Sequence, residues 1–204
     1  MVYTINTVQE HYVREKMIWI TSPYLRHNIF STFEELSNKE RQLKEWIGGA
    51  VHGYWDNLCY YIFNDLYDEG LEIPMGARQS LIRILYTREE VNEVYNFACF
   101  LDNLTEEIGD LQPDYAYINH PQWSKVWRWS KNIYDMMGKN NKKYNFYEEC
   151  YEKFNNMDFH EYGTYVERKN AEAGNEMIPY EKPIIYKRSE LDKNLNNLIT
   201  DVFA

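Results

Sequence analysis

The sequence predicts a mainly α-helical protein, a single-domain helical bundle with a long irregular segment before a C-terminal helix. Apolar residues recur every three or four positions in several segments, which is the spacing of one face of a helix. Residues that commonly begin helices stand directly before several of these segments. The chain also has only nine Gly and six Pro in 204 residues, which disfavours an all-β fold with many tight turns.

The N-terminal segment, residues 1–36, contains an apolar strip that fits a helix or a strand. Because a residue before a proline is pushed out of the α region, we expect a break at Pro23 and a first helix that begins at Ser31 or Ser37. Ser37 and Glu40 have the spacing of a capping box, in which two side chains satisfy the free backbone donors of a helix start. The apolar residues that follow at helical spacing are Leu43, Trp46, Ile47 and Ala50.

Residues 37–138 form the predicted acidic helical core. A helix is expected over residues 56–68, and Gly70 supplies a stop after it. Pro74 suits the first turn of a further helix. The apolar residues of that further helix are Leu81, Ile82 and Leu85.

The strongest predicted helix opens with a second capping box, Thr87 and Glu90, and ends at Gly109. Acids in its first turns, Glu90 among them, are explained by the helix dipole. One face is apolar at positions Val91, Val94, Tyr95, Ala98, Leu101, Leu104 and Ile108.

Residues 112–119 are predicted to form a turn, and the last core helix to begin at His120 and Pro121. Residues 139–143 are polar and are the predicted boundary of a C-terminal helical extension, residues 139–204, that packs on the core. Within it we expect a helix over residues 145–155. Residues 158–187 lack periodicity and are expected to be irregular. A final amphipathic helix is expected after Ser189.

The negative charge is concentrated in one part of the chain. Residues 56–114 hold thirteen Asp or Glu and three Arg, whereas the remaining residues hold nineteen acids and nineteen Lys or Arg. A net charge of −10 argues against direct binding of nucleic acid and is compatible with a basic protein partner or with solubility alone. Acids at the C-terminal end of the 56–68 helix interact unfavourably with the helix dipole. Two explanations of their presence are weighed equally: they bind a partner or a cation, or they are simply well solvated.

The predicted partner-binding surface is drawn from this charge clustering. It consists of acidic residues from the 56–68 helix end and from the helix that ends at Gly109. These residues are Asp65, Asp68, Glu69, Glu72, Asp102, Glu106 and Asp110.

Aromatic residues are abundant, with nineteen Tyr, nine Phe and six Trp. Three of the Trp alternate with basic residues between Trp123 and Lys131. Such a mixture can stack on nucleobases or on a ligand. A helix with buried Trp and solvated Lys gives the same pattern, and that structural explanation is favoured.

Known catalytic and metal-binding motifs are not found. The five His are scattered, the sequence lacks a phosphate-binding loop and a nucleophile elbow, and no cofactor or metal is expected. Cys59, Cys99 and Cys150 are expected to be free thiols in a reducing compartment. With neither a signal peptide nor a membrane-spanning run in the sequence, a cytoplasmic protein is expected.

Several short runs resemble a family of small acidic bacterial proteins. Some toxin-neutralising immunity proteins are similar to this family. The likeness covers about residues 41–137. The runs are Arg-Gln-Leu-Lys-Glu-Trp from Arg41, Tyr-Tyr-Ile-Phe-Asn-Asp-Leu from Tyr60, Glu-Glu-Val from Glu89 up to Gly109, and Pro-x-Trp from Pro121. This resemblance implies a helical interaction domain and no catalytic residues.

The expected function is therefore that of a non-enzymatic intracellular binding or inhibitor protein, which neutralises a basic protein partner such as a toxin through an acidic, aromatic-rich surface. A second hypothesis is a phage or mobile-element inhibitor of a host defence or nucleic-acid enzyme. A third is an enzyme whose active site is built from dispersed residues. The oligomeric state is left open by the sequence.

Overall fold

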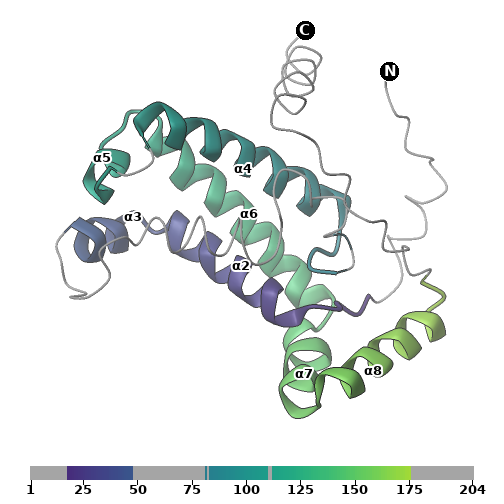
Figure 1. Ribbon diagram of the computed structural model, residues 1–204. Helices are drawn as coiled ribbons and strands as arrows, with labels where there is room; N and C mark the ends of the chain where they lie inside the picture. Colours follow the sequence, from purple (N-terminus) through teal and green to yellow (C-terminus); the bar gives the residue numbers. More distant parts are fainter. Residues whose placement is uncertain (1–17, 48–80, 82, 110–111, 176–204) are drawn as a thin grey trace, which may run out of the picture.

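The computed structural model describes residues 18–47, 81, 83–109 and 112–175 (Figure 1). Within these residues the protein is mainly α-helical and has no strand, only an isolated bridge between Leu81 and Leu85. The predicted fold class is thus confirmed. The predicted helices over 56–68 and after Ser189 lie outside the described residues.

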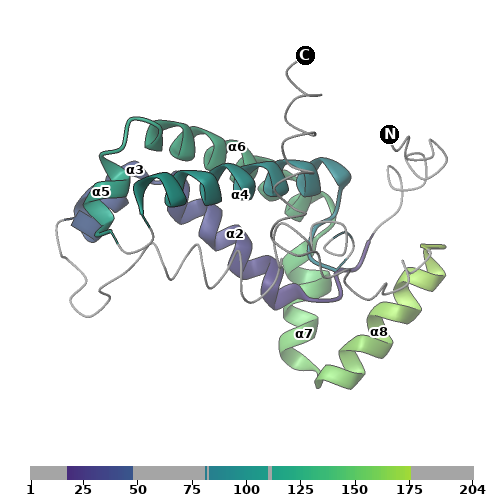
Figure 2. The ribbon, with the colours of Figure 1, turned by 45° about the horizontal axis from the view of Figure 1, so that its top comes forward.

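Three long helices lie side by side, α2 (Pro23–Ser37), α4 (Arg88–Ile108) and α6 (Trp123–Lys143) (Figures 1 and 2). The chain runs along α6 in the direction opposite to that in α2 and α4. At one end of this bundle lie the short α3 (Lys39–Arg41), the π-helical turn η1 (Gln42–Ile47) and α5 (Asp114–Ile118). At the other end, η3 (Tyr147–Tyr151), α7 (Glu152–Asn156) and α8 (Phe159–Glu172) follow α6.

The main core lies between the three long helices. The face predicted for α4 is largely correct, because five of its seven apolar residues are buried, whereas Tyr95 and Ile108 are half-buried. From α2 and α6 the core receives large aromatic and aliphatic side chains, and burial of this apolar surface is the main stabilising contribution. Those buried to 1 % exposure or less are Ile29, Phe33, Leu36, Trp123, Val126, Ile133 and Met137.

A second core joins residues 18–20 to η3 and α8. Asn170 of α8 binds both backbone groups of Trp19: its Oδ1 accepts from the Trp19 N–H at 3.1 Å and its Nδ2 donates to the Trp19 carbonyl at 3.0 Å. Tyr162 Oη donates to the carbonyl of Ile20 at 2.7 Å. The N-terminal segment is therefore attached to a helix about 150 residues later in the chain.

The first helix begins at Pro23, eight residues before Ser31, so the predicted start was wrong. A proline interrupts a helix in its interior, but at the first helical position its missing N–H needs no partner, so Pro23 begins α2. The predicted cap is also displaced by one residue, because Asn38 Oδ1 accepts from the Arg41 N–H, whereas the Ser37 hydroxyl donates to the Glu34 carbonyl.

Two further segments differ from the expectation. Residues 83–86 form turns that bury Ile84, Leu85 and Tyr86, where a helix was predicted from the positions of Leu81, Ile82 and Leu85. Conversely, the predicted turn over 112–119 contains the short α5, which begins after Pro113 and buries Tyr117 and Ile118. A few apolar residues in a short segment do not distinguish these two structures.

The C-terminal part is more regular than predicted. Helix α6 continues through the expected connector at 139–143, and Lys142 and Lys143 in its last turn favour the helix dipole. Helix α8 occupies residues 159–172, where an irregular segment was expected. A complete capping box of Asp158 and Glu161 begins it.

Candidate functional site

Two of the seven predicted partner-binding residues lie in the described part of the chain. Asp102 and Glu106 are four positions apart in α4 and therefore share one face of that helix. Asp102 is half-buried and Glu106 is exposed. The other five, Asp65, Asp68, Glu69, Glu72 and Asp110, lie outside the described residues, so their position relative to this pair stays a prediction.

The end of the bundle that carries Glu106 also carries other acids. From Asp102 to Ser124 the sequence contains five Asp or Glu and neither Lys nor Arg. Glu107 faces His120, with 3.7 Å between Oε1 and Nε2, and accepts from Gln122 at 3.3 Å. Asp114 is in the first turn of α5. The C-terminal turns of α4 and the start of α5 thus carry carboxylates and neither Lys nor Arg.

Large apolar side chains are exposed at the same end of the bundle. Tyr115 of α5 is 59 % exposed, and Leu43 and Ile47 of η1 are 42 % and 41 % exposed. α5 packs against η1 and against α4, so the three side chains belong to neighbouring elements. We call these three residues, together with Asp102, Glu106, Glu107 and Asp114, the acidic end surface.

Gln42 fixes η1 to the rest of the bundle. Its Oε1 accepts from the indole N–H of Trp123 at 3.1 Å and of Trp127 at 2.7 Å, and its Nε2 donates to the Glu35 carbonyl at 2.9 Å. The side chain is fully buried. An amide with both ends engaged holds η1 in one orientation and so positions Leu43 and Ile47.

Beneath η1 lies a buried carboxylate, Glu35. It accepts from the Trp46 indole at 3.0 Å and pairs with Arg41 at 2.8 Å. Burial raises the pKa of Glu35 above its usual value, against the opposing effect of the Arg41 charge. Because these contacts occupy the carboxylate, Glu35 acts here as an anchor for η1.

The Trp and Lys alternation in α6 has a structural explanation. Trp123 and Trp127 both donate to Gln42, and Trp129 donates to Glu93 Oε2 at 2.8 Å. Lys125 Nζ lies 4.1 Å from the centroid of the Phe100 ring, within the range of a cation–π contact. The indole groups therefore join helices to one another, as the favoured explanation expects.

A buried ion pair between Arg26 and Glu90 was not predicted from the sequence. Both side chains are fully buried and are 2.9 Å apart. Arg26 also donates to the Ile84 carbonyl and to Asn141 Oδ1, and its guanidinium carbon lies 4.1 Å from the centroid of the Tyr86 ring. The helix dipole alone, which the sequence offers as the reason for Glu90, does not account for these contacts. The detectable signal was Arg26 itself, three positions before Ile29 on the apolar face of α2.

The thiols of Cys99, which is half-buried, and Cys150, which is buried, are poorly suited to nucleophilic chemistry. Burial raises the pKa of Cys150 and of Cys99, which disfavours the reactive thiolate. Both cysteines are free, as predicted. In the described ranges, no group of three or more His, Cys, Asp or Glu is arranged to hold a metal ion.

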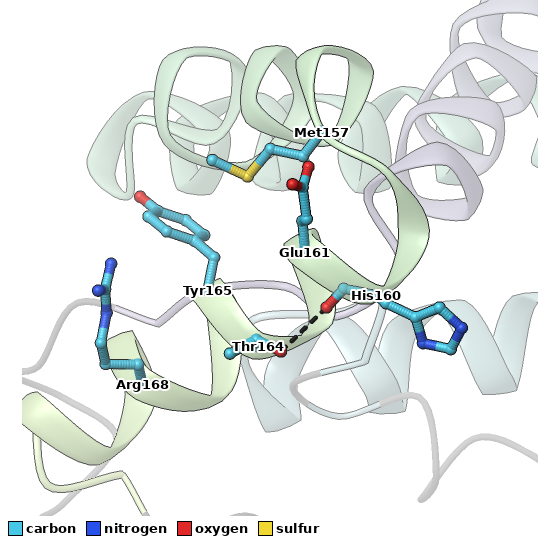
Figure 3. A pocket seen from close by; sticks show the side chains of 6 residues that line it. All are labelled: Met157, His160, Glu161, Thr164, Tyr165 and Arg168. Atoms are coloured by element: carbon cyan, nitrogen blue, oxygen red, sulfur yellow. Dashed lines mark hydrogen bonds between the residues drawn. The ribbon is translucent and has the colours of Figure 1, made fainter.

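Figure 3 shows a depression of about 550 Å³ beside α8. Its polar side chains are already used within the protein: Glu161 caps the helix, Thr164 donates to the His160 carbonyl, and Tyr165 donates to Glu149. The His160 ring is directed away from Glu161 and Tyr165. These groups do not converge on a common point where a substrate would react.

Comparison with known proteins gives one result. The model of a family described as "Domain of unknown function (DUF7945)" matches residues 20–144. Neither the curated proteins nor the solved structures contain a match. The matched range includes the three long helices and the whole acidic end surface. In the part of the chain that the structure describes, no helix has the length and hydropathy needed to cross a membrane.

Proposed function

As the chain belongs to this family of unknown function, whose description assigns no activity, we propose that it is a non-enzymatic intracellular binding protein that neutralises a basic protein partner. Its mode of action would be that of an immunity protein that neutralises a toxin. The proposal is supported chiefly by the acidic end surface, where exposed Tyr115, Leu43 and Ile47 adjoin a region without Lys or Arg.

The two kinds of residue in this surface suit two stages of binding. Negative charge attracts a basic partner over a distance and increases the association rate. Tyr buries a large area at low conformational cost and is enriched among the residues that dominate binding energy. Tyr115, at 59 % exposure, is the candidate for that central contact.

The basic residues of α3 and η1 leave this charge asymmetry in place. Arg41 is engaged by Glu35 and Glu45, each at 2.8 Å. Lys39 Nζ lies 4.7 Å from the centroid of the Trp127 ring. These two cations therefore have contacts within the protein, whereas the third, Lys44 of η1, is exposed beside Leu43. The α4 and α5 side of the surface keeps its excess of carboxylates.

The test is capture of partners from the native host by the tagged full-length chain, followed by titration of the purified partner. E106K/E107K reverses two exposed charges of the surface, and Y115A removes its aromatic residue. E167K and F159A are the matched controls, because Glu167 and Phe159 are exposed on α8 at the opposite end.

We expect one stoichiometric basic partner. Its affinity should fall by about tenfold or more for E106K/E107K and for Y115A, and should be unchanged for both controls. Circular dichroism should show that all four variants keep the wild-type helix content. A partner that binds every variant with wild-type affinity would contradict the assigned surface. Absence of any protein partner at low salt would contradict the proposed function.

A further inference from the structure

A groove on another face of the molecule has the features of a small-molecule site. It has a volume of about 640 Å³ and lies where α2, the second half of α6 and η3 meet. Volumes of this size are typical of ligand pockets. It is separate from the acidic end surface, since η3 follows the opposite end of α6.

Aromatic rings line the groove. Phe30 and Tyr134 stack with centroids 4.6 Å apart and planes 16° apart. Tyr147 of η3 also contributes and is 36 % exposed. Gly138 lies between these walls, and a Cβ there would be 3.7 Å from the Phe30 ring, so the absence of a side chain keeps the space beside the ring open.

A buried amide donor also belongs to the lining. Asn141 is only 4 % exposed, and its Oδ1 accepts from Arg26 Nε at 2.7 Å. Because Arg only donates, this bond fixes which end of the amide is oxygen. The Nδ2 donor is buried without a hydrogen-bond partner. Buried polar groups are nearly always paired, so this donor points to a ligand that supplies an acceptor.

Two lysines at the groove are available to an anion. Lys139 and Lys142 line it, and in the described ranges neither is ion-paired. Asp135 and Glu148 are the lining carboxylates, and Asp135 is paired with Lys131 at 2.5 Å. Tyr134 Oη donates to a third carboxylate, Glu34, at 3.1 Å, so the two lysines are the groups of the lining that can receive an anion.

We propose that this groove binds a small planar anion, an aromatic ring that carries a carboxylate or a phosphate. The ring stacks on Tyr134 and Tyr147, an acceptor atom takes the hydrogen bond from Asn141 Nδ2, and the anionic group lies between Lys139 and Lys142. The aromatic ring supplies the planar body that stacks. A carboxylate and a phosphate both present clustered oxygen acceptors to the two lysines.

The test is calorimetric titration of the full-length chain with benzoate and with phenyl phosphate. Cyclohexanecarboxylate retains the charge without the planar ring, and benzyl alcohol retains the ring without the charge. G138L places a side chain in the groove beside Phe30, while G138A adds only a methyl group at ordinary contact distance. K139Q/K142Q removes the two cations, and R168Q removes an exposed cation on α8 as a control.

We expect saturable binding of one or both aromatic anions, and binding at least about tenfold weaker for both non-matching compounds. K139Q/K142Q should lower the affinity for the aromatic anion to a similar degree, and G138L should abolish its binding. G138A and R168Q should leave the affinity unchanged. Circular dichroism identifies any variant that has lost its fold. Equal binding by G138L, equal binding of the neutral ring, or no saturable binding to wild type would each overturn the proposal.

Discussion

Replacement of Glu90 by Gln should strongly destabilise the bundle. Four donors converge on this carboxylate: Oε1 accepts from Arg26 Nη2 and Asn140 Nδ2, both at 2.9 Å, and Oε2 accepts from Arg26 Nη1 at 3.1 Å and the Tyr86 N–H at 2.6 Å. Gln has nearly the same shape but presents an NH₂ group to two of these donors. The guanidinium would also remain buried without a counter-charge.

Removal of one partner of a buried ion pair costs about 3–5 kcal/mol. For a chain of this length such a loss lowers Tm by about 6–20 °C. Urea and thermal denaturation of E90Q, followed by circular dichroism, measure both quantities. D135N is the matched control, because the Lys131–Asp135 pair is about half exposed and such pairs contribute at most about 1 kcal/mol.

The pair should also show coupling in a double-mutant cycle. R26M alone leaves the Glu90 carboxylate buried without its cation, and R26M/E90M removes both charges together. We expect the double variant to lose less stability than the sum of R26M and E90M. A loss in E90Q no larger than that in D135N, or strict additivity in the cycle, would refute the assignment of Arg26 and Glu90 as the connection between α2 and α4.

Three further predictions concern individual contacts. G109A should lower the free energy of unfolding by about 1–2 kcal/mol, because Gly109 has φ +106°. G163A, whose added methyl meets no atom within contact distance, should leave stability unchanged or raise it by up to about 1 kcal/mol. Urea denaturation of the two variants measures both effects. Q42L should cost about 2–4 kcal/mol because two indole donors lose their acceptor, and equal denaturation midpoints for Q42L and wild type would contradict it. Burial raises the pKa of Glu35, so folding favours its protonated form, and the stability that this form contributes is lost as pH rises above 4.5. The free energy of unfolding of E35Q should therefore rise relative to that of wild type between about pH 4 and about pH 7. Urea denaturation of both proteins at the two pH values tests this.

Sequence periodicity was sufficient for α4. The α4 pattern from Val91 to Leu104 is regular over four turns, and both ends carry standard signals, Thr87 at the start and Gly109 at the end. Five of its seven predicted core positions are buried. Such agreement is expected where local propensity and tertiary packing favour the same structure.

Periodicity failed where tertiary contacts decide the structure. Helix α8 buries only Tyr162, Val166 and Asn170, and one of these three is polar because it binds the backbone of Trp19. Arg26 and Glu90 are likewise polar residues in the core, stabilised by partners far away in the sequence. A pattern based on hydrophobicity assigns such residues to the surface.

The partner-binding residues chosen by charge clustering stay a prediction. Two of them, Asp102 and Glu106, share a face of α4. The exposure of the neighbouring apolar residues was not predicted, because Tyr115 lies in a segment expected to be a turn and Leu43 belongs to an apolar pattern typical of a core-facing helix. Their exposure follows from how η1 and α5 pack, which the sequence pattern does not specify.

The most direct test of the proposed function is the salt dependence of partner affinity for E106K/E107K beside E167K. If the acidic end surface attracts a basic partner, wild type and E167K should lose affinity steeply between about 0.05 M and about 0.5 M salt, because the Debye length shortens several-fold. E106K/E107K should bind more weakly at low salt and show a shallower dependence. Identical affinities and slopes for the two variants would contradict the account.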